Sequence, residues 1–346
     1  MKKTKTFNRA VAAVFAVILT VSLPAADIRN HSTWRDTQGN IIDCHEGGIL
    51  RMGGTFYWYG RAYKGNIDGI YGAGGARFRC GLNCYSSTNL TSWTFRGAIL
   101  TYPVTGFLTA GTWHRPRVLY TTQTGTYVLW FFMFPTGTSR ASTLIVATAD
   151  APTGPFIVQT GPNFGESGDL ALLQDTDGQG YIAYDDQMRR SIRVSRLTPD
   201  FLKLTTATTI ALKAGGGKSY EAASLIRYRG NYIVAGSGVE GLNPTDTTYA
   251  VADSPLGPYT DKGLMSQQKT WNSQISSFFY LSESDQLIAL NEQWLIGPDG
   301  KRVPAELSCQ LWLPVTFDPD TGIAQMQHVQ QWDPWAPATT TRQTDR

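Results

Sequence analysis

The stretch DLALLQDTDGQGYIAYDD (169–186) contains the unit from which the chain is built. Two apolar segments flank a polar turn, and Asp177-Gly178 suits a tight turn because glycine adopts positive φ without steric cost. The stretch is therefore predicted to form a β-hairpin. The same pattern recurs in GGILRMGGTFYWYG (47–60), PRVLYTTQTGTYVLWFF (116–132), AASLIRYRGNYIVAGSG (222–238) and SSFFYLSESDQLIALNE (276–292).

The regular spacing of these hairpins predicts the architecture. Successive hairpins begin 69, 53, 53 and 54 residues apart. A weaker pair of strands is predicted after each of the first four hairpins, at 84–100, 143–159, 192–205 and 249–263. Five units of about four strands predict an all-β, five-bladed β-propeller. Segment 311–332 is predicted to complete a blade or to clasp the chain ends, whereas a pair of β-sandwiches would leave the spacing unexplained.

The composition supports a turn-rich β protein. Hydrophobic residues make up 42% of the 346 residues, and charged residues make up only 16%. The apolar content argues against disorder, and the 35 glycines and 17 prolines argue against a coiled coil or a helical bundle.

Residues 1–26 have the layout of a secretory signal peptide. Lys2, Lys3, Lys5 and Arg9 precede an apolar stretch (10–23), which the small residues Ala25 and Ala26 follow. An uncleaved N-terminal anchor is the alternative. We expect the propeller to occupy 27–346 and the protein to be secreted or periplasmic. Removal of the segment leaves 26 basic and 27 acidic residues, so neither a nucleic-acid partner nor a membrane partner is expected, and the oligomeric state is not indicated.

The four cysteines leave two interpretations open. Cys80 and Cys84 are close enough in sequence to form a local disulfide, and two free thiols are equally compatible. Cys44 and His45, taken with this pair, match no standard zinc-finger spacing. No cofactor is predicted to be required, although a structural ion on the propeller axis near His45 is possible.

Propeller geometry predicts where the chemistry lies. The first strand of each blade lines the axis, so the residues just before these strands gather at one mouth of the channel. These residues are polar or ionisable in every blade. They are Cys44-His45-Glu46, Trp113-His114-Arg115, Glu166-Ser167-Gly168-Asp169, Ser219-Tyr220-Glu221 and Asn272-Ser273-Gln274.

Paired carboxyl groups with nearby aromatic rings indicate glycoside hydrolysis. One carboxylic acid must protonate the leaving oxygen, and it needs a raised pKa to remain protonated near neutral pH. Glu221 is the candidate acid, because the start of a buried strand would desolvate it, and Asp169 is predicted to tune it or bind a sugar hydroxyl. The residues predicted to contact sugar are Tyr59, Trp113, Trp271 and Asn243, together with His45, Arg115 and Tyr220.

Six segments in order resemble glycoside hydrolase family 43, and within it the branch containing exo-β-1,3-galactanases. They are 34–60, 115–131, SGDLALLQDTDGQGYIAY (167–184), 220–259, WNSQISSF (271–278) and LWLPVTFD (311–318). The resemblance implies a five-bladed propeller and inverting hydrolysis of a β-galactosidic link. It implies that Glu221 is the general acid, that Gln274 stands where a carboxylate base is usual, and that Asp169 is the family's blade-three aspartate.

Two positions depart from that branch. His114, in WHRPRV, stands where the branch has a substrate-contacting glutamate, and Glu46 stands where it has a glycine. Glu46 is predicted to contact substrate or to serve as the base, and His114 to bind a hydroxyl or an anionic substituent. The alternative is that Glu46 faces away and that His114 only fills space.

The resulting hypothesis is an exported glycoside hydrolase, inverting and exo-acting on a β-1,3-galactan-type polysaccharide or oligosaccharide. One alternative keeps the fold but has the enzyme cleave anhydro-galactosyl or α-L-arabinosyl links. Another alternative is a carbohydrate-binding propeller without catalytic activity.

Overall fold

The computed structural model describes residues 27–63, 81–100, 111–135, 142–159, 164–165, 167–186, 190–241, 243–293 and 308–337. The predicted signal peptide (1–26) and Cys80, with its possible disulfide, lie outside these ranges. Cys44 and Cys84 are buried thiols outside any disulfide, and Cys309 is buried as well. Within the described ranges, no helix has the length and apolar character needed to cross a membrane.

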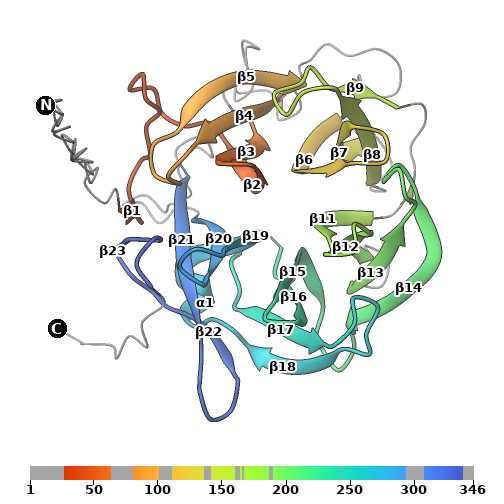
Figure 1. Cartoon of the computed structure of the whole chain (residues 1–346). Helices are drawn as coiled ribbons and strands as arrows, with labels where there is room; N and C mark the ends of the chain where they lie inside the picture. Colours follow the sequence, from red (N-terminus) through yellow and green to blue (C-terminus); the bar gives the residue numbers. More distant parts are fainter. Residues whose placement is uncertain are drawn as a thin grey trace, which may run out of the picture.

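Five antiparallel sheets surround a central axis and confirm the predicted five-bladed β-propeller (Figure 1). Blade one contains β2 (His45–Met52), β3 (Thr55–Arg61), β4 (Leu82–Ser87) and β5 (Thr94–Leu100). Blade two contains β6 (Gly111–Thr121), β7 (Thr126–Pro135) and β8 (Thr143–Ala149), with β9 (Ile157–Val158) and β10 (Phe164–Gly165) both paired to β8. Blade three contains β11 (Ser167–Gln174), β12 (Gly180–Asp186), β13 (Ser191–Leu197) and β14 (Leu204–Leu212).

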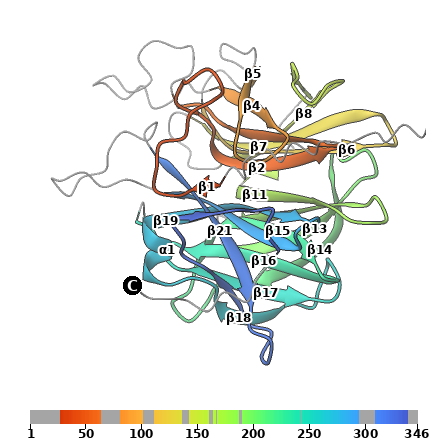
Figure 2. The ribbon, with the colours of Figure 1, turned by 60° about the vertical axis from the view of Figure 1, so that its left-hand side comes forward.

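The fourth and fifth blades follow the same plan. Blade four contains β15 (Tyr220–Tyr228), β16 (Asn231–Gly238), β17 (Thr247–Ala252) and β18 (Thr260–Leu264), which follow one another outward from the axis (Figure 2). Blade five contains β19 (Ser273–Leu281), β20 (Gln286–Gln293), β21 (Cys309–Phe317) and β22 (Ala324–Met326). The predicted hairpin turns are present, with Gly53, Gly125, Gly178 and Gly230 at positive φ. α1 (Gln268–Asn272), just before β19, is a left-handed turn with φ of 57° at Lys269 and 51° at Trp271.

Every inner strand is interrupted by a β-bulge near its start. The register with the second strand shifts between His45 and Gly48, His114 and Arg117, Ser167 and Leu170, Glu221 and Ser224, and Ile275 and Ser277. In three blades a residue within the bulge has a left-handed backbone, with φ of 53° at Glu46, 52° at Arg115 and 58° at Ala222. A bulge re-aims side chains, so the bulges determine which residues of each inner strand face the channel.

Aromatic side chains fill the interfaces between blades. Trp58 and Trp312 pack edge-to-face between blades one and five, with ring centroids 5.1 Å apart, and Trp93 lies 5.2 Å from Trp58. Tyr59 and Trp113 belong to the cluster between blades one and two. Each such ring removes a large apolar area from water, which contributes about 1.5–3 kcal/mol per buried large side chain. Aromatic residues make up 12% of the chain, and they serve mainly to pack the blades against one another.

The two ends of the described chain clasp each other. β1 (Ile28–Arg29) pairs antiparallel with β23 (Gln331–Trp332), while β21 and β22 complete blade five. Segment 311–332 therefore completes blade five and also clasps the chain ends, so both predicted roles are confirmed. Asn30 secures the clasp, since its buried amide donates to Trp312 O (3.0 Å) and Val329 O (2.8 Å) and accepts from Trp312 N (2.8 Å).

Asn30→Ala is expected to destabilise the fold by about 2–4 kcal/mol, because it removes the partner of the Trp312 N–H and of the Val329 carbonyl, while the Trp312 carbonyl keeps its hydrogen bond from Trp332 Nε1. Urea unfolding followed by tryptophan fluorescence measures this change. Asn231→Ala is the matched control, because its amide makes only one 3.5 Å hydrogen bond, to Arg229 O, at an exposed turn. Equal stability of the two variants would contradict the proposed role of Asn30.

Candidate active site

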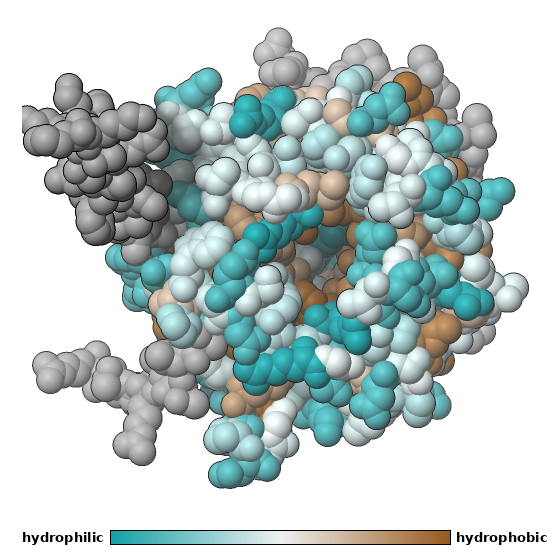
Figure 3. All heavy atoms as spheres, viewed as in Figure 1, coloured by the Kyte–Doolittle hydropathy of each residue, from teal (hydrophilic) through white to brown (hydrophobic). Residues whose placement is uncertain are grey.

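Polar side chains gather at the end of the channel where the inner strands begin, which we call the mouth. Because the strands are antiparallel, the second strand of each blade ends there, and Arg61 lies opposite His45, Asp186 opposite Ser167, and Glu292 opposite Gln274. The space-filling view shows the molecule hollowed at the axis, with hydrophilic residues around the hollow (Figure 3). The mouth thus receives side chains from two strands of a blade.

Glu221, on β15, has the properties expected of a catalytic acid. Its Oε1 accepts a 2.9 Å hydrogen bond from Gln274 Nε2 on β19. Burial, together with the negative charge of Asp169, raises its pKa to about 7, although Arg115 and the Gln274 amide act in the opposite direction. The carboxyl group can therefore carry a proton near neutral pH while its side chain remains 19% exposed to the mouth.

Arg115 holds three blades together beneath Glu221. Its Nε donates to Asp169 Oδ1 (3.1 Å), its Nη2 to Gln274 Oε1 (2.6 Å), and its Nη1 to the Ile275 carbonyl (2.8 Å). Asp169 Oδ2 also accepts from the Ala222 amide at 2.7 Å, directly after Glu221. Burial alone would lower the pKa of Arg115, but Asp169 and Glu46 raise it, so the guanidinium stays charged. Asp169, Gln274 and Glu221 are thereby fixed relative to one another.

Glu46 and His114 form a second polar cluster at the mouth. Glu46 Oε2 lies 2.9 Å from His114 Nδ1, and Glu46 Oε1 accepts from Tyr63 Oη (3.1 Å) and Arg61 Nη1 (3.4 Å). Burial would raise the pKa of Glu46, but His114 and Arg61 hold it well below its usual range, so the carboxylate is ionised. The His114 ring stacks on Phe132, with centroids 4.8 Å apart. The two residues at which the sequence departs from the branch pattern are thus direct partners.

The axis below this cluster is filled by Arg117. Its Nη1 donates to the carbonyls of Glu46 and Pro116, both at 2.8 Å, and its Nη2 donates to the Ser276 carbonyl. Burial lowers its pKa to about 9, with the neighbouring Arg115 charge acting in the same direction. Arg117 therefore occupies the channel between blades one, two and five, directly below the mouth.

Asp185 and Arg190 adjoin the acid and were missed from the sequence. Arg190 Nη1 lies 3.9 Å from Glu221 Oε2 and 3.7 Å from Asp185 Oδ2. Burial, with the charge of Asp169, raises the pKa of Asp185 well above its usual range. The sequence signal that would have found Asp185 is its place at the end of β12, the second strand of its blade.

Three of the residues predicted to contact substrate have side chains that are buried between blades. Trp113 (0% exposed) and Tyr59 (1%) lie in the core between blades one and two. Tyr220 is buried in the core between blades three and four. Sequence position placed them near the mouth, but the alternation of the strands points them into the interfaces between blades.

His45 and Arg115 are also buried, and each contacts carboxyl groups of neighbouring residues. His45 Nδ1 lies 2.9 Å from Glu292 Oε1, and its Nε2 lies 3.4 Å from Asp43 Oδ1. Burial would lower the His45 pKa, but Glu292 and Asp43 outweigh it and raise the pKa to about 9. The imidazolium itself supplies positive charge between these acids. No group of three or more potential metal ligands occurs among the described residues.

The remaining two predicted contacts lie in different surroundings. Asn243 is exposed in the turn after β16, where its backbone N–H donates to the Glu240 carbonyl at 3.0 Å. Trp271 is half-buried, and one face of its ring stacks on His328 with centroids 4.7 Å apart. Contact of Asn243 or Trp271 with sugar stays a prediction.

A five-bladed propeller whose mouth holds a protonatable carboxyl beside further carboxylates is the arrangement of a propeller glycoside hydrolase. The comparison with protein families agrees, because the model for glycosyl hydrolases family 43 matches residues 43–278. The chain belongs to this family and is a glycoside hydrolase.

Solved structures with the same fold include exo-β-1,3-galactanases. The enzyme from Clostridium thermocellum is 25% identical, with a TM-score of 0.73 over 89% of this chain and 67% of that one. The enzyme from Phanerochaete chrysosporium, solved with galactose, is 25% identical, with a TM-score of 0.72 over 88% and 68%. A family 43 β-1,3-galactosidase is 26% identical, with a TM-score of 0.75 over 89% and 64%. A comparison with curated protein sequences gave no match.

The raised pKa of Glu221 predicts the alkaline limb of the pH–activity profile. Since the acid must be protonated, kcat/KM should fall as the pH rises through about 7. Asp169→Asn removes a negative charge that raises this pKa, so the limb should move to lower pH. Asp261→Asn, at an exposed site, is the control. A limb that stays in place or moves to higher pH in Asp169→Asn would contradict the electrostatic assignment.

Proposed function

We propose that this glycoside hydrolase removes galactosyl residues from the non-reducing end of β-1,3-galactan chains with inversion of configuration. The observation that carries the proposal is the hydrogen-bonded Glu221–Gln274 pair, fixed by Arg115 and Asp169 at a mouth open to substrate. The galactanases with the same fold support the choice of sugar. The basic and apolar pattern of residues 1–26 supports export of the enzyme.

In the proposed reaction, Glu221 protonates the glycosidic oxygen as the bond to the anomeric carbon breaks. A water molecule attacks that carbon from the opposite face and transfers its proton to a base. The blind channel supports attack at a chain end, because Arg117 and its carbonyl partners fill the axis below the mouth. A chain end can enter such a pocket, whereas an internal segment of a polysaccharide needs an open cleft.

Glu46 is the better candidate for the base. Gln274 lies against Glu221 at 2.9 Å, with its amide nitrogen also donating to Ser237 Oγ and its oxygen bound by Arg115. This contact leaves no room for water between Gln274 and the acid, whereas inverting enzymes separate their two groups by about 6.5–9.5 Å. Glu46 is ionised and lies on another blade. We assign Gln274 to orienting Glu221 and Glu46 to activating water, with His114 holding Glu46.

Glu221→Gln tests the acid. The variant should lose about 10³-fold in kcat/KM on β-1,3-galactotriose, because the amide cannot donate the required proton. The same incubation with wild-type enzyme, followed by proton NMR, should show α-galactose as the first product. Near-wild-type turnover by a correctly folded Glu221→Gln would refute the assignment, and β-galactose as the first product would refute inversion. Binding of galactotriose without cleavage by the wild type would favour a carbohydrate-binding propeller.

Azide rescue separates the two candidate bases. Glu46→Ala opens space for a small anion where water is activated, so azide should restore turnover of an activated galactoside in that variant. Gln274→Ala should show no rescue, because its partner Glu221 needs orientation and not a nucleophile. Rescue of Gln274→Ala alone would assign the water to Gln274 and overturn the role given to Glu46.

A further inference from the structure

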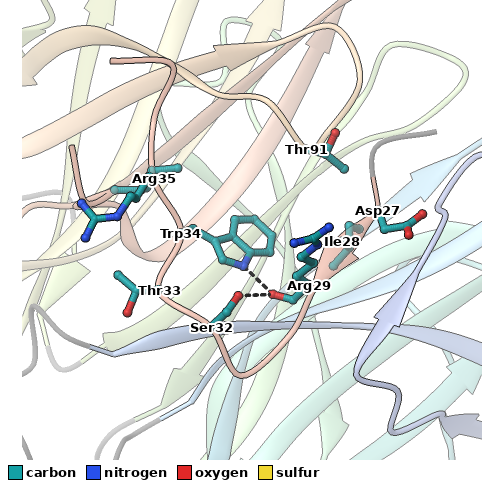
Figure 4. Close-up of a pocket in the computed structure, with 9 residues that line it drawn as sticks. Asp27, Ile28, Arg29, Ser32, Thr33, Trp34, Arg35 and Thr91 are labelled. Carbon is teal, nitrogen blue, oxygen red and sulfur yellow. Dashed lines mark hydrogen bonds between the residues drawn. The ribbon is translucent and has the colours of Figure 1, made fainter. Parts of the chain in front are cut away.

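A second cavity lies away from the mouth, where the start of the described chain crosses blades one and five. It has a volume of about 350 Å³ and lies beside Trp34, Arg29, Arg35, Ser32, Asp27 and Thr91 (Figure 4). Thr91 is in the turn between β4 and β5. β4 leaves the mouth at Leu82, opposite Arg61, and reaches Ser87 opposite Phe56. The cavity is therefore near the opposite end of the propeller from Glu221.

Trp34 gives this cavity a rigid aromatic wall. Its ring packs edge-to-face on Trp312, with centroids 4.9 Å apart, and on Trp58 at 6.0 Å. Its Nε1 donates to the Arg29 carbonyl at 2.7 Å, and Ser32 Oγ donates to the same oxygen at 2.8 Å (Figure 4). The indole is thus fixed from one side by the core and from its edge by a tight turn. An indole held in this way can stack on a pyranose ring without losing further side-chain entropy.

Two guanidinium groups at the cavity lack an acidic partner. Arg29 and Arg35 are exposed, and neither forms an ion pair with a carboxylate among the described residues. Arg35 Nη1 donates only to the Gly39 carbonyl at 2.8 Å, and the Asp27 carboxylate is already bound by Gln331. Arginine forks match a carboxylate bidentately.

We propose that this cavity is a secondary carbohydrate site for an acidic sugar, a pyranose that carries a carboxylate. The ring of the sugar stacks on Trp34, and its carboxylate pairs with one of the two guanidinium groups, which lie on opposite sides of the indole (Figure 4). Such a site holds the enzyme on an acid-substituted polysaccharide while the mouth works on a chain end. The proposal takes from the proposed function only that the substrate is a polysaccharide, because binding here requires no hydrolysis.

Calorimetric titration of the full protein with methyl β-glucuronide tests the site. The gluco configuration separates this binding from the mouth, which is proposed to take galactosyl groups. We expect a dissociation constant of about 1 mM for the glucuronide. Methyl β-glucoside, which lacks the carboxylate, should bind at least about tenfold more weakly. Arg29→Ala/Arg35→Ala should abolish glucuronide binding, while hydrolysis of galactotriose stays at the wild-type rate because both residues lie outside the mouth.

Control experiments separate the contribution of ring stacking from that of anion binding. Trp34→Phe keeps an aromatic ring in the core but reduces the stacking face, so it should weaken glucuronide binding while circular dichroism confirms the fold. Sulfate that binds as tightly as the glucuronide would show a bare anion site and overturn the sugar assignment. Glucuronide binding that survives the double arginine variant, or no binding by the wild type, would overturn the proposal. None of these results depends on whether Glu221 is the catalytic acid.

Discussion

The Arg115 guanidinium is the interaction on which the rest of the site depends. It is buried, charged and bonded to Asp169 on blade three, Gln274 on blade five and the Ile275 carbonyl. Removing one partner from such a network leaves a buried charge unpaired, which typically costs about 3–5 kcal/mol. The same contacts that close the ring of blades at the axis therefore fix the groups around Glu221. Structural closure and catalytic geometry share one set of hydrogen bonds.

The opposing charges around Glu221 explain its role. Burial and Asp169 raise its pKa, while Arg115 and Gln274 lower it, and the result is about 7. The pKa of Glu46 is shifted in the opposite direction, because His114 and Arg61 hold it well below the usual range. Two carboxyl groups in one mouth thus have pKa values pushed apart, which is how acid and base roles are divided between similar side chains. Burial and the Asp169 charge therefore favour the acid role for Glu221, whereas His114 and Arg61 favour the base role for Glu46.

The sequence predicted the blades well because hairpin signals are local. Alternating apolar residues on either side of a glycine turn are enough to identify a β-hairpin. Once the propeller was predicted, its topology alone placed the first residues of each inner strand, such as Glu221 and Asp169, at the mouth. The burial of Tyr59 and Trp113 was missed because they were placed by their position along the chain, whereas the alternation of side chains along a strand points them into the interface between blades one and two. Arg61 and Glu292 were missed since they lie at the ends of second strands, and only cross-strand pairing brings them opposite His45 and Gln274. Asp185 was missed for the same reason, because it precedes Asp186, which pairs with Ser167 at the start of β11.

The central claim is that Glu221 is a carboxylic acid held protonated near neutral pH by its surroundings. Carbon-13 NMR titration of glutamate-labelled protein, with the Glu221 signal assigned by its absence from Glu221→Gln, measures that proton directly. A titration midpoint at about 7 is the result the structure predicts. A midpoint near the ordinary glutamate value of about 4.3 would show an ionised group at working pH and would contradict its role as the acid.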